Sequence, residues 1–140
     1  IWRLDPAGVN APVSITGGAG RQSGVTIRWQ NLSRDQNYVM FGEDYLFTLF
    51  NNKNKTAGIK WVEFGKPFGG VEGLQQTHPT RLANFVKAKQ ANVLRYSTED
   101  YAHTPGIRVG QVSDVLQQPL GVKSLYEPNP QQSQYLWGTA

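Results

Sequence analysis

The two histidines are the side chains best suited to acid–base chemistry near neutral pH. His78 and His103 lie 25 residues apart, each close to a proline in a sequence typical of a turn. The chain has no HExxH motif, no GxSxG motif and no closely spaced metal triad. We therefore interpret both as turn or surface histidines and predict no catalytic residue. The alternative is a small His-dependent phosphodiesterase, in which both would act with a charged neighbour: Glu99, Asp100 or Arg95.

Two pairs of adjacent carboxylates are the next candidates for catalysis. Glu43 and Asp44 form one pair, and Glu99 and Asp100 form the other. Neighbouring side chains of a strand point to opposite faces, so neither pair is expected to work as a dyad. The chain contains no cysteine, which excludes a disulfide, a thiolate metal site and a cysteine nucleophile. We predict no metal and no cofactor.

The glycine-rich stretch GGAGRQSG, residues 17–24, resembles a phosphate loop only in composition. It lacks the GxxxxGK[ST] order, and it lacks the combination of a strand before it and a helix after it that such a loop requires. We expect a tight connection that leads into the next strand.

A basic segment is the feature that best suits nucleic-acid binding. Residues 78–97 contain four cations and no acid: Arg81, Lys87, Lys89 and Arg95. Single-stranded nucleic acid needs cations together with aromatic platforms. Trp61 and Phe64 are separated by an odd number of positions, so they face opposite sides of a strand. A nucleic-acid-binding module built on the basic segment is therefore the alternative function, and sugar binding is a more remote one.

Composition indicates a loop-rich β protein. The chain has 140 residues, of which 17% are charged, against about 25% in an average soluble domain. Its net charge of +4 would attract anionic partners without requiring them. It has no apolar run of transmembrane length and no signal peptide, and it begins at Ile1. From these features we expect a processed chain with an extracytoplasmic or virion location.

Alternation of apolar and polar residues predicts several strands. Residues 24–30, GVTIRWQ, place Val25, Ile27 and Trp29 on a dry face and Thr26, Arg28 and Gln30 on a polar face. Residues 45–50 are apolar on both faces apart from Thr48 and suit a central strand. Residues 58–64 form the next strand, and the NNKNK turn makes the two a hairpin. Further strands are predicted at 12–16, 92–96 and 106–109, with a short helical turn from Ser113 to Gln118.

One helix is predicted near residues 80–90. Thr80 is a plausible N-cap behind Pro79. Leu82, Phe85 and Val86 then form an apolar stripe at helical spacing.

Both termini are extended, poor in charge and tipped with aromatic residues. The first twelve residues carry Trp2 and Leu4, and the uncharged stretch 128–140 carries Tyr135, Leu136 and Trp137. Burial of each such side chain is worth on the order of 1.5 to 3 kcal/mol, so something should cover them. They either fold back over the core or bind a neighbouring chain.

The predicted fold is mainly β, with α+β as a possibility: a single-domain β-sandwich or partly open barrel with one helix near 80–90. We divide it into an N-terminal arm (1–12), a globular domain (13–118) and a Pro/Gln-rich C-terminal arm (119–140). The predicted function is a non-enzymatic structural subunit of a virion or of a bacterial surface or secretion apparatus. Its partners would be copies of itself or neighbouring subunits, with nucleic acid as a further possibility. The predicted contacts are Trp2, Leu4, Tyr135, Leu136 and Trp137, with Arg28 on a second surface.

Overall fold

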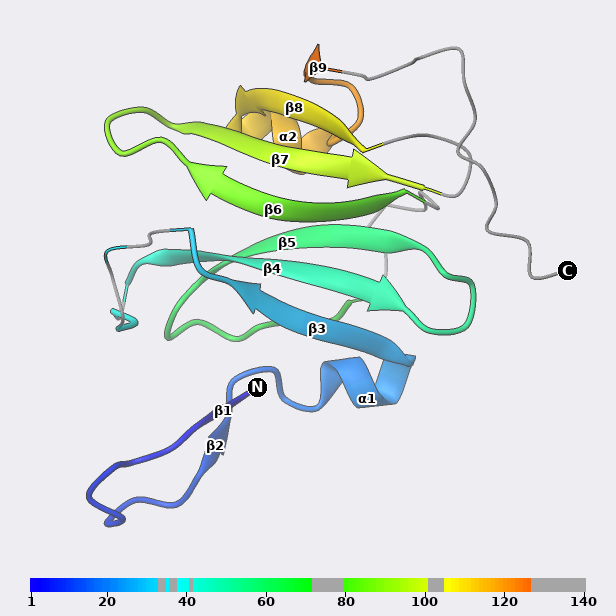
Figure 1. Ribbon diagram of the computed structural model, residues 1–140. Coiled ribbons are helices and arrows are strands. Elements are labelled where there is room, and N and C mark those ends of the chain that lie inside the picture. Colours follow the sequence, from blue (N-terminus) through cyan, green and yellow to red (C-terminus); the bar gives the residue numbers. More distant parts are fainter. Residues whose placement is uncertain (33–34, 36–37, 41, 72–79, 101–104, 127–140) are drawn as a thin grey trace, which may run out of the picture. The chain divides into compact units, whose positions relative to one another are not determined.

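The protein is mainly β, as predicted (Figure 1). The computed structural model describes residues 1–32, 35, 38–40, 42–71, 80–100 and 105–126. Within these residues the strands form three antiparallel sheets of two, three and four strands, consistent with a β-sandwich-like domain. They belong to two compact units, residues 1–31 with 36–77 and residues 32–35 with 78–140. Each unit is described by itself. None of the described helices is long and apolar enough to cross a membrane.

The first twelve residues are part of a hairpin. Strand β1 (Trp2–Arg3) pairs with β2 (Val13–Ser14), and Ile15 N–H donates to the Ile1 carbonyl at 3.0 Å. Figure 1 shows this hairpin extending beyond α1. The short predicted strand at 12–16 is therefore confirmed, and it pairs with the segment predicted as an extended arm.

The glycine-rich stretch forms a short helix, α1 (Ala19–Ser23), where we expected a simple connection. Glycines in the left-handed conformation stand at both ends, with φ 79° at Gly18 and φ 68° at Gly24. A Cβ on Gly20 would lie 2.5 Å from the Val25 carbonyl oxygen. The glycines thus allow one helical turn to pack closely against the start of the next strand.

The three-stranded sheet follows the chain order β3 (Val25–Gln30), β4 (Asp44–Asn51) and β5 (Ala57–Glu63). The central position of β4 and the β4–β5 hairpin confirm the prediction. The dry face predicted for β3 needs one correction. Trp29 is 39% exposed, so it is not part of the buried core. Among the described strands, β3 is an edge strand, and the Trp29 ring packs edge-on against Tyr45 with 6.1 Å between the ring centroids.

One face of this sheet is covered by α1 and by the loop after β5. Phe47, Leu49 and Phe68 form the buried cluster, and Ala19 and Ile27 pack against it. The Phe47 and Phe68 rings pack edge-on, with 5.2 Å between their centroids. Phe68, which could have projected outwards, is therefore part of the core.

The helix predicted near residues 80–90 is wrong, because this segment is strand β6 (Arg81–Lys87). The pairing of β6 with β7 shifts register between Ala83 and Val86, which marks a β-bulge. Asn84 in the bulge has φ 55°. The extra residue puts Leu82 and Phe85 on the same buried face although they are three positions apart. A bulged strand therefore reproduces the apolar spacing of a helix.

The four-stranded sheet continues in chain order with β7 (Val93–Glu99), β8 (Gly106–Gln111) and β9 (Lys123–Tyr126), and α2 (Val112–Gln117) links the last two. The strands expected at 92–96 and 106–109 and the helical turn after Ser113 are thus present. Leu94, Tyr96 and Val115 are completely buried in this unit. Tyr96 donates its hydroxyl hydrogen bond to the Pro119 carbonyl, and Arg108 Nη1 donates to the Leu120 carbonyl at 2.8 Å.

Candidate functional site

The residues proposed for catalysis do not form a site in the described part of the chain. His78 and His103 lie outside it. Glu99 forms an ion pair with Arg81 at 2.6 Å, and Asp100 accepts a hydrogen bond from Thr80 at 3.4 Å. Among the residues that the structure describes, no group of three or more His, Asp or Glu side chains could hold a metal ion.

The basic segment spans two strands and their loop, and half of its cations have acidic partners. Arg81 pairs with Glu99, and Lys89 lies 2.5 Å from Asp35. Arg95 is exposed, whereas Lys87 is partly buried at the end of β6. The ion pairs on Arg81 and Lys89 reduce the positive potential that this segment offers to a phosphate backbone.

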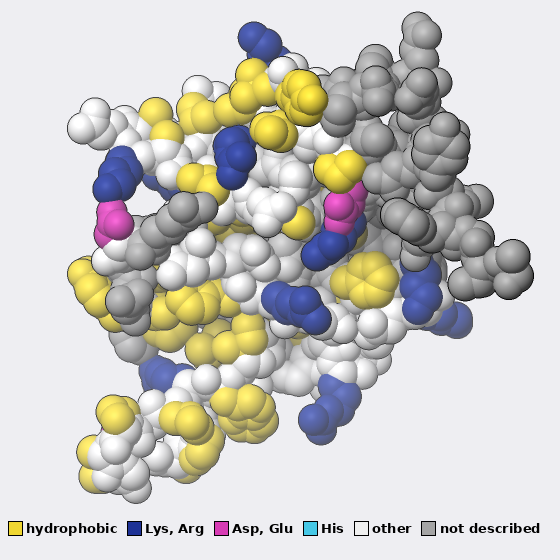
Figure 2. Space-filling model, in the orientation of Figure 1, with side chains coloured by type: hydrophobic (Ala, Val, Ile, Leu, Met, Phe, Trp, Pro, Cys, Tyr) yellow, Lys and Arg dark blue, Asp and Glu magenta, His cyan; other side chains and the backbone are white. Residues whose placement is uncertain are grey.

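The apolar side chains of the β1–β2 hairpin are exposed. Trp2 is 64% exposed and Leu4 is 67% exposed, while Val9 and Val13 are also open to solvent. No residue of the range 1–14 is buried. Figure 2 shows these hydrophobic side chains gathered on the hairpin. Two predicted contact residues, Trp2 and Leu4, thus belong to a larger apolar surface, which we call the hairpin surface: Ile1, Trp2, Leu4, Val9 and Val13.

The loop of this hairpin is held by the carboxylate of Asp5. Asp5 Oδ1 accepts from the Ala7 N–H at 3.0 Å, and Oδ2 accepts from the Asn10 N–H at 2.9 Å and from Asn10 Nδ2 at 2.8 Å. These hydrogen bonds, the one from the Asn10 backbone first, lower the pKa of Asp5. The sequence signal was Asp5-Pro6 followed by Gly8, which is turn chemistry. Residues 1–12 were predicted only as an extended arm, and the predicted contact residues did not include Val9 and Val13, which are exposed on the same hairpin.

The polar face of β3 is exposed at Arg28 and hydrogen-bonded on either side of it. Gln30 Nε2 donates to Thr48 Oγ1 at 2.9 Å, and Asn52 Nδ2 donates to Thr26 Oγ1 at 3.1 Å. Phe50, the cross-strand partner of Thr26, is 41% exposed on the same face. Sequence analysis assigned Phe50 to a central strand and missed its exposure, which follows from its place at the hairpin end.

The C-terminal contact residues Tyr135, Leu136 and Trp137 lie outside the described residues. Their role stays a prediction. The strand before them, β9, is exposed along its whole length and has a neighbouring strand on one side only among the described residues. Leu125 and Tyr126 are its exposed apolar side chains.

Comparison of the chain with protein-family models, with curated proteins and with solved structures finds no match.

Proposed function

We propose that this protein is a non-enzymatic subunit that assembles with copies of itself, with the hairpin surface of one copy docking on strand β9 of the next. The proposed assembly is a virion, or a surface or secretion apparatus of a bacterium. The proposed location is therefore extracytoplasmic or in a virion. The observation that carries the proposal is the exposure of the apolar hairpin residues, with Trp2 at 64% and Leu4 at 67%.

The β1–β2 hairpin would be stabilised by a partner that buries its exposed apolar side chains. An isolated two-stranded hairpin is marginally stable in water at best. Each fully buried large apolar side chain contributes on the order of 1.5 to 3 kcal/mol, a contribution that Trp2 and Leu4 do not make while exposed. The Asp5 hydrogen bonds hold the loop in one conformation, so less conformational entropy is lost on docking than for a disordered arm.

Strand β9 supports the choice of a second copy as the partner. Its four residues are all exposed, and among the described residues it has a neighbouring strand on one side only, beside the side chains of Leu125 and Tyr126. An open, apolar strand edge is a template for pairing with another chain. Within the part of the chain that the structure describes, the same chain therefore carries both an exposed strand pair and an open strand edge. A contact between two different surfaces of identical chains is head to tail and builds rings or filaments.

Light scattering tests the proposal through two variants that each lose one half of the contact. The intact chain should form oligomers, while Trp2→Ser with Leu4→Ser, and separately Leu125→Asp, should give monomers of 15.6 kDa. An equimolar mixture of the two variants keeps one intact hairpin surface and one intact β9. It should therefore form a dimer and nothing larger.

The matched control is Tyr38→Ser, because Tyr38 is 63% exposed but lies outside both surfaces. This variant should assemble like the intact chain. An intact chain that stays monomeric at its highest soluble concentration would contradict self-assembly. Oligomers that persist in both variants, or a mixture that stays monomeric, would show that these two surfaces are not the contact.

A further inference from the structure

Charges are segregated along the β4–β5 hairpin. Asp44 pairs in register with Glu63 at one end of the two strands. Phe50 pairs with Ala57 at the other end, six residues further along β4, which is about 20 Å at roughly 3.3 Å per residue. The turn beyond Phe50 carries Lys53 and Lys55 and no acid. One end of the sheet is therefore acidic and the other basic.

The ring of Phe50 is open to solvent at the basic end. Its neighbours in register are Thr26 on β3 and Ala57 on β5, both small. Neither side chain is large enough to cover a phenyl ring, and 41% of Phe50 is exposed. Phe50 is thus a flat apolar surface between two strands.

Three cations lie at this end of the sheet: Arg28 on β3, and Lys53 and Lys55 in the turn that follows β4. Arg28 pairs with Thr48, so it lies diagonally from Phe50 on the same face, within reach of a long side chain. Within the described part of the chain, neither the Arg28 guanidinium nor Lys53 Nζ has an acidic partner. Lys55 Nζ donates to the Asn52 carbonyl at 2.7 Å, within the turn.

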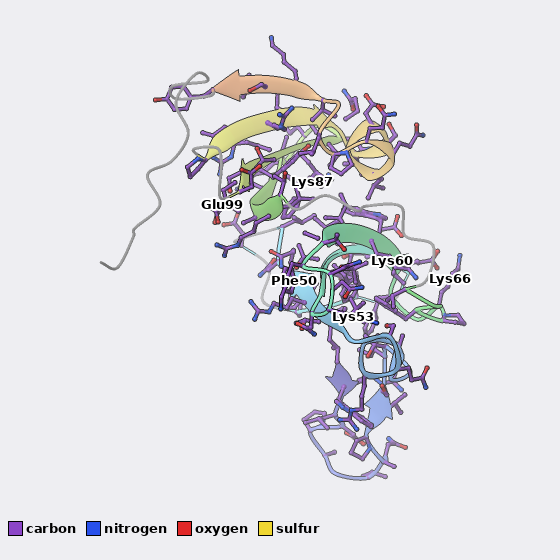
Figure 3. All side chains as sticks on the ribbon, turned by 90° about the vertical axis from the view of Figure 1, so that its right-hand side faces the viewer. Phe50, Lys53, Lys60, Lys66, Lys87 and Glu99 are labelled. Atoms are coloured by element: carbon purple, nitrogen blue, oxygen red, sulfur yellow. The ribbon has the colours of Figure 1, made fainter. Side chains whose placement is uncertain are left out.

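Lys60 on β5 and Lys66 in the loop after it have structural roles. Lys66 pairs with Glu63 at 2.6 Å. Lys60 Nζ lies 4.7 Å from the Phe68 ring centroid and donates to the Gly70 carbonyl at 2.8 Å, and burial lowers its pKa. Figure 3 looks onto the basic end, where Phe50 and Lys53 are labelled, and shows Lys66 apart from them. Among the described residues, the cations of this sheet and its hairpin turn without an acidic partner or a side-chain hydrogen bond thus lie at the same end as Phe50: Arg28 and Lys53.

We propose that Phe50, Arg28 and Lys53 form a binding site for single-stranded nucleic acid. Phe50 stacks on an unpaired base, and the two cations bind the flanking phosphates while Lys55 adds to the local potential. A duplex offers no exposed base face to one aromatic side chain, so the site selects single strands. This site lies on a different unit from the basic segment around Arg81, and it is independent of the hairpin surface.

Fluorescence anisotropy with a labelled oligothymidylate at low salt tests the site. Phe50→Leu keeps apolar bulk but removes the aromatic face, and it should weaken binding about 5- to 100-fold, as loss of one stacked base does. Lys53→Ala and Arg28→Ala should each weaken binding and reduce the slope of log K against log salt by about 0.7. Circular dichroism verifies that each variant is folded.

Lys66→Ala is the matched control, because it removes the same charge from the loop after β5, at the acidic end of the hairpin. It should leave affinity nearly unchanged. Equal losses for Lys66→Ala and Lys53→Ala, unchanged binding by Phe50→Leu, or a duplex that binds as tightly as the single strand would each overturn the proposal. So would an absence of binding at low salt. The same titration on the Trp2→Ser, Leu4→Ser variant separates this result from the state of assembly.

Discussion

Tyr96 joins the core of the four-stranded sheet to the turn after α2. Its side chain is completely buried and stacks on Phe85 at 5.3 Å, and its hydroxyl donates to the Pro119 carbonyl. Burial raises the pKa of Tyr96 to about 12, an effect that the nearby Arg108 charge partly opposes. The phenol is therefore held in its neutral form well above the pH at which it would ionise in the unfolded chain.

This pKa predicts a loss of stability in alkali. The folded chain holds the Tyr96 proton more tightly than the unfolded chain, so this contribution is complete below pH 10 and declines as pH rises from 10 to 12. The decline should be on the order of 2 to 3 kcal/mol in the free energy of unfolding. Urea titrations from pH 9 to 12 measure it. In Tyr96→Phe the curve should be flatter over this range, and an unchanged slope would contradict the assignment.

Strand β6 is the element whose sequence pattern was misleading. Leu82, Phe85 and Val86 have helical spacing, and the bulge at Asn84 produces this spacing within a strand. No local feature separates the two structures, because the choice depends on pairing with β7. Strands β4 and β5 were predictable, since their alternation is regular and a turn-forming sequence joins them. Pattern alone thus identifies regular strands and fails where a bulge changes the period.

The bulge makes a prediction about Asn84. A backbone φ of 55°, as at Asn84, is more strained for a residue with a Cβ than for glycine. Asn84→Gly and Asn84→Ala both lose the hydrogen bond from Asn84 Nδ2 to Ser97 Oγ at 2.9 Å. The glycine variant should therefore be the more stable of the two by about 1 kcal/mol in urea unfolding.

Ala83→Gly is the control for this comparison. Ala83 has a regular partner, Ser97, in the same strand. There, glycine should cost about 0.5 to 1 kcal/mol relative to alanine. If glycine were also less stable than alanine at position 84, the left-handed conformation would not be the source of the bulge's sequence preference.

At the scale of the molecule, surfaces were harder to predict than the fold class. Composition and strand periodicity were enough for a mainly β protein. The sequence left two alternatives for Trp2 and Leu4, folding back over the core or binding a neighbouring chain, and the structure shows both side chains exposed. Phe50 looked like core because it lies in a central strand. The exposure of Phe50 depends on the size of its cross-strand neighbours. The sequence of its own strand does not identify those neighbours.

Assembly should depend on acidity through Asp5. Its pKa is lowered from 3.8 in the folded hairpin, so the loop hydrogen bonds are complete above pH 3.8 and are lost as pH falls through the lower, folded value. If the hairpin surface docks as proposed, light scattering should show weaker self-association below that pH. Asp5→Asn at neutral pH should resemble the acidified protein, and oligomers of this variant as stable as those of the intact chain would contradict a role for the loop.

The order of the strands has a consequence for how fast the chain reaches its native structure. In each of the three sheets, every strand pairs with its neighbours in sequence. Loop closure between such segments costs little entropy, and chains rich in local contacts cross lower folding barriers than chains that must join distant strands. Each unit can nucleate from its own contiguous hairpins, β4–β5 in one and β7–β8 in the other. These two hairpins are where amide protection should develop first during refolding.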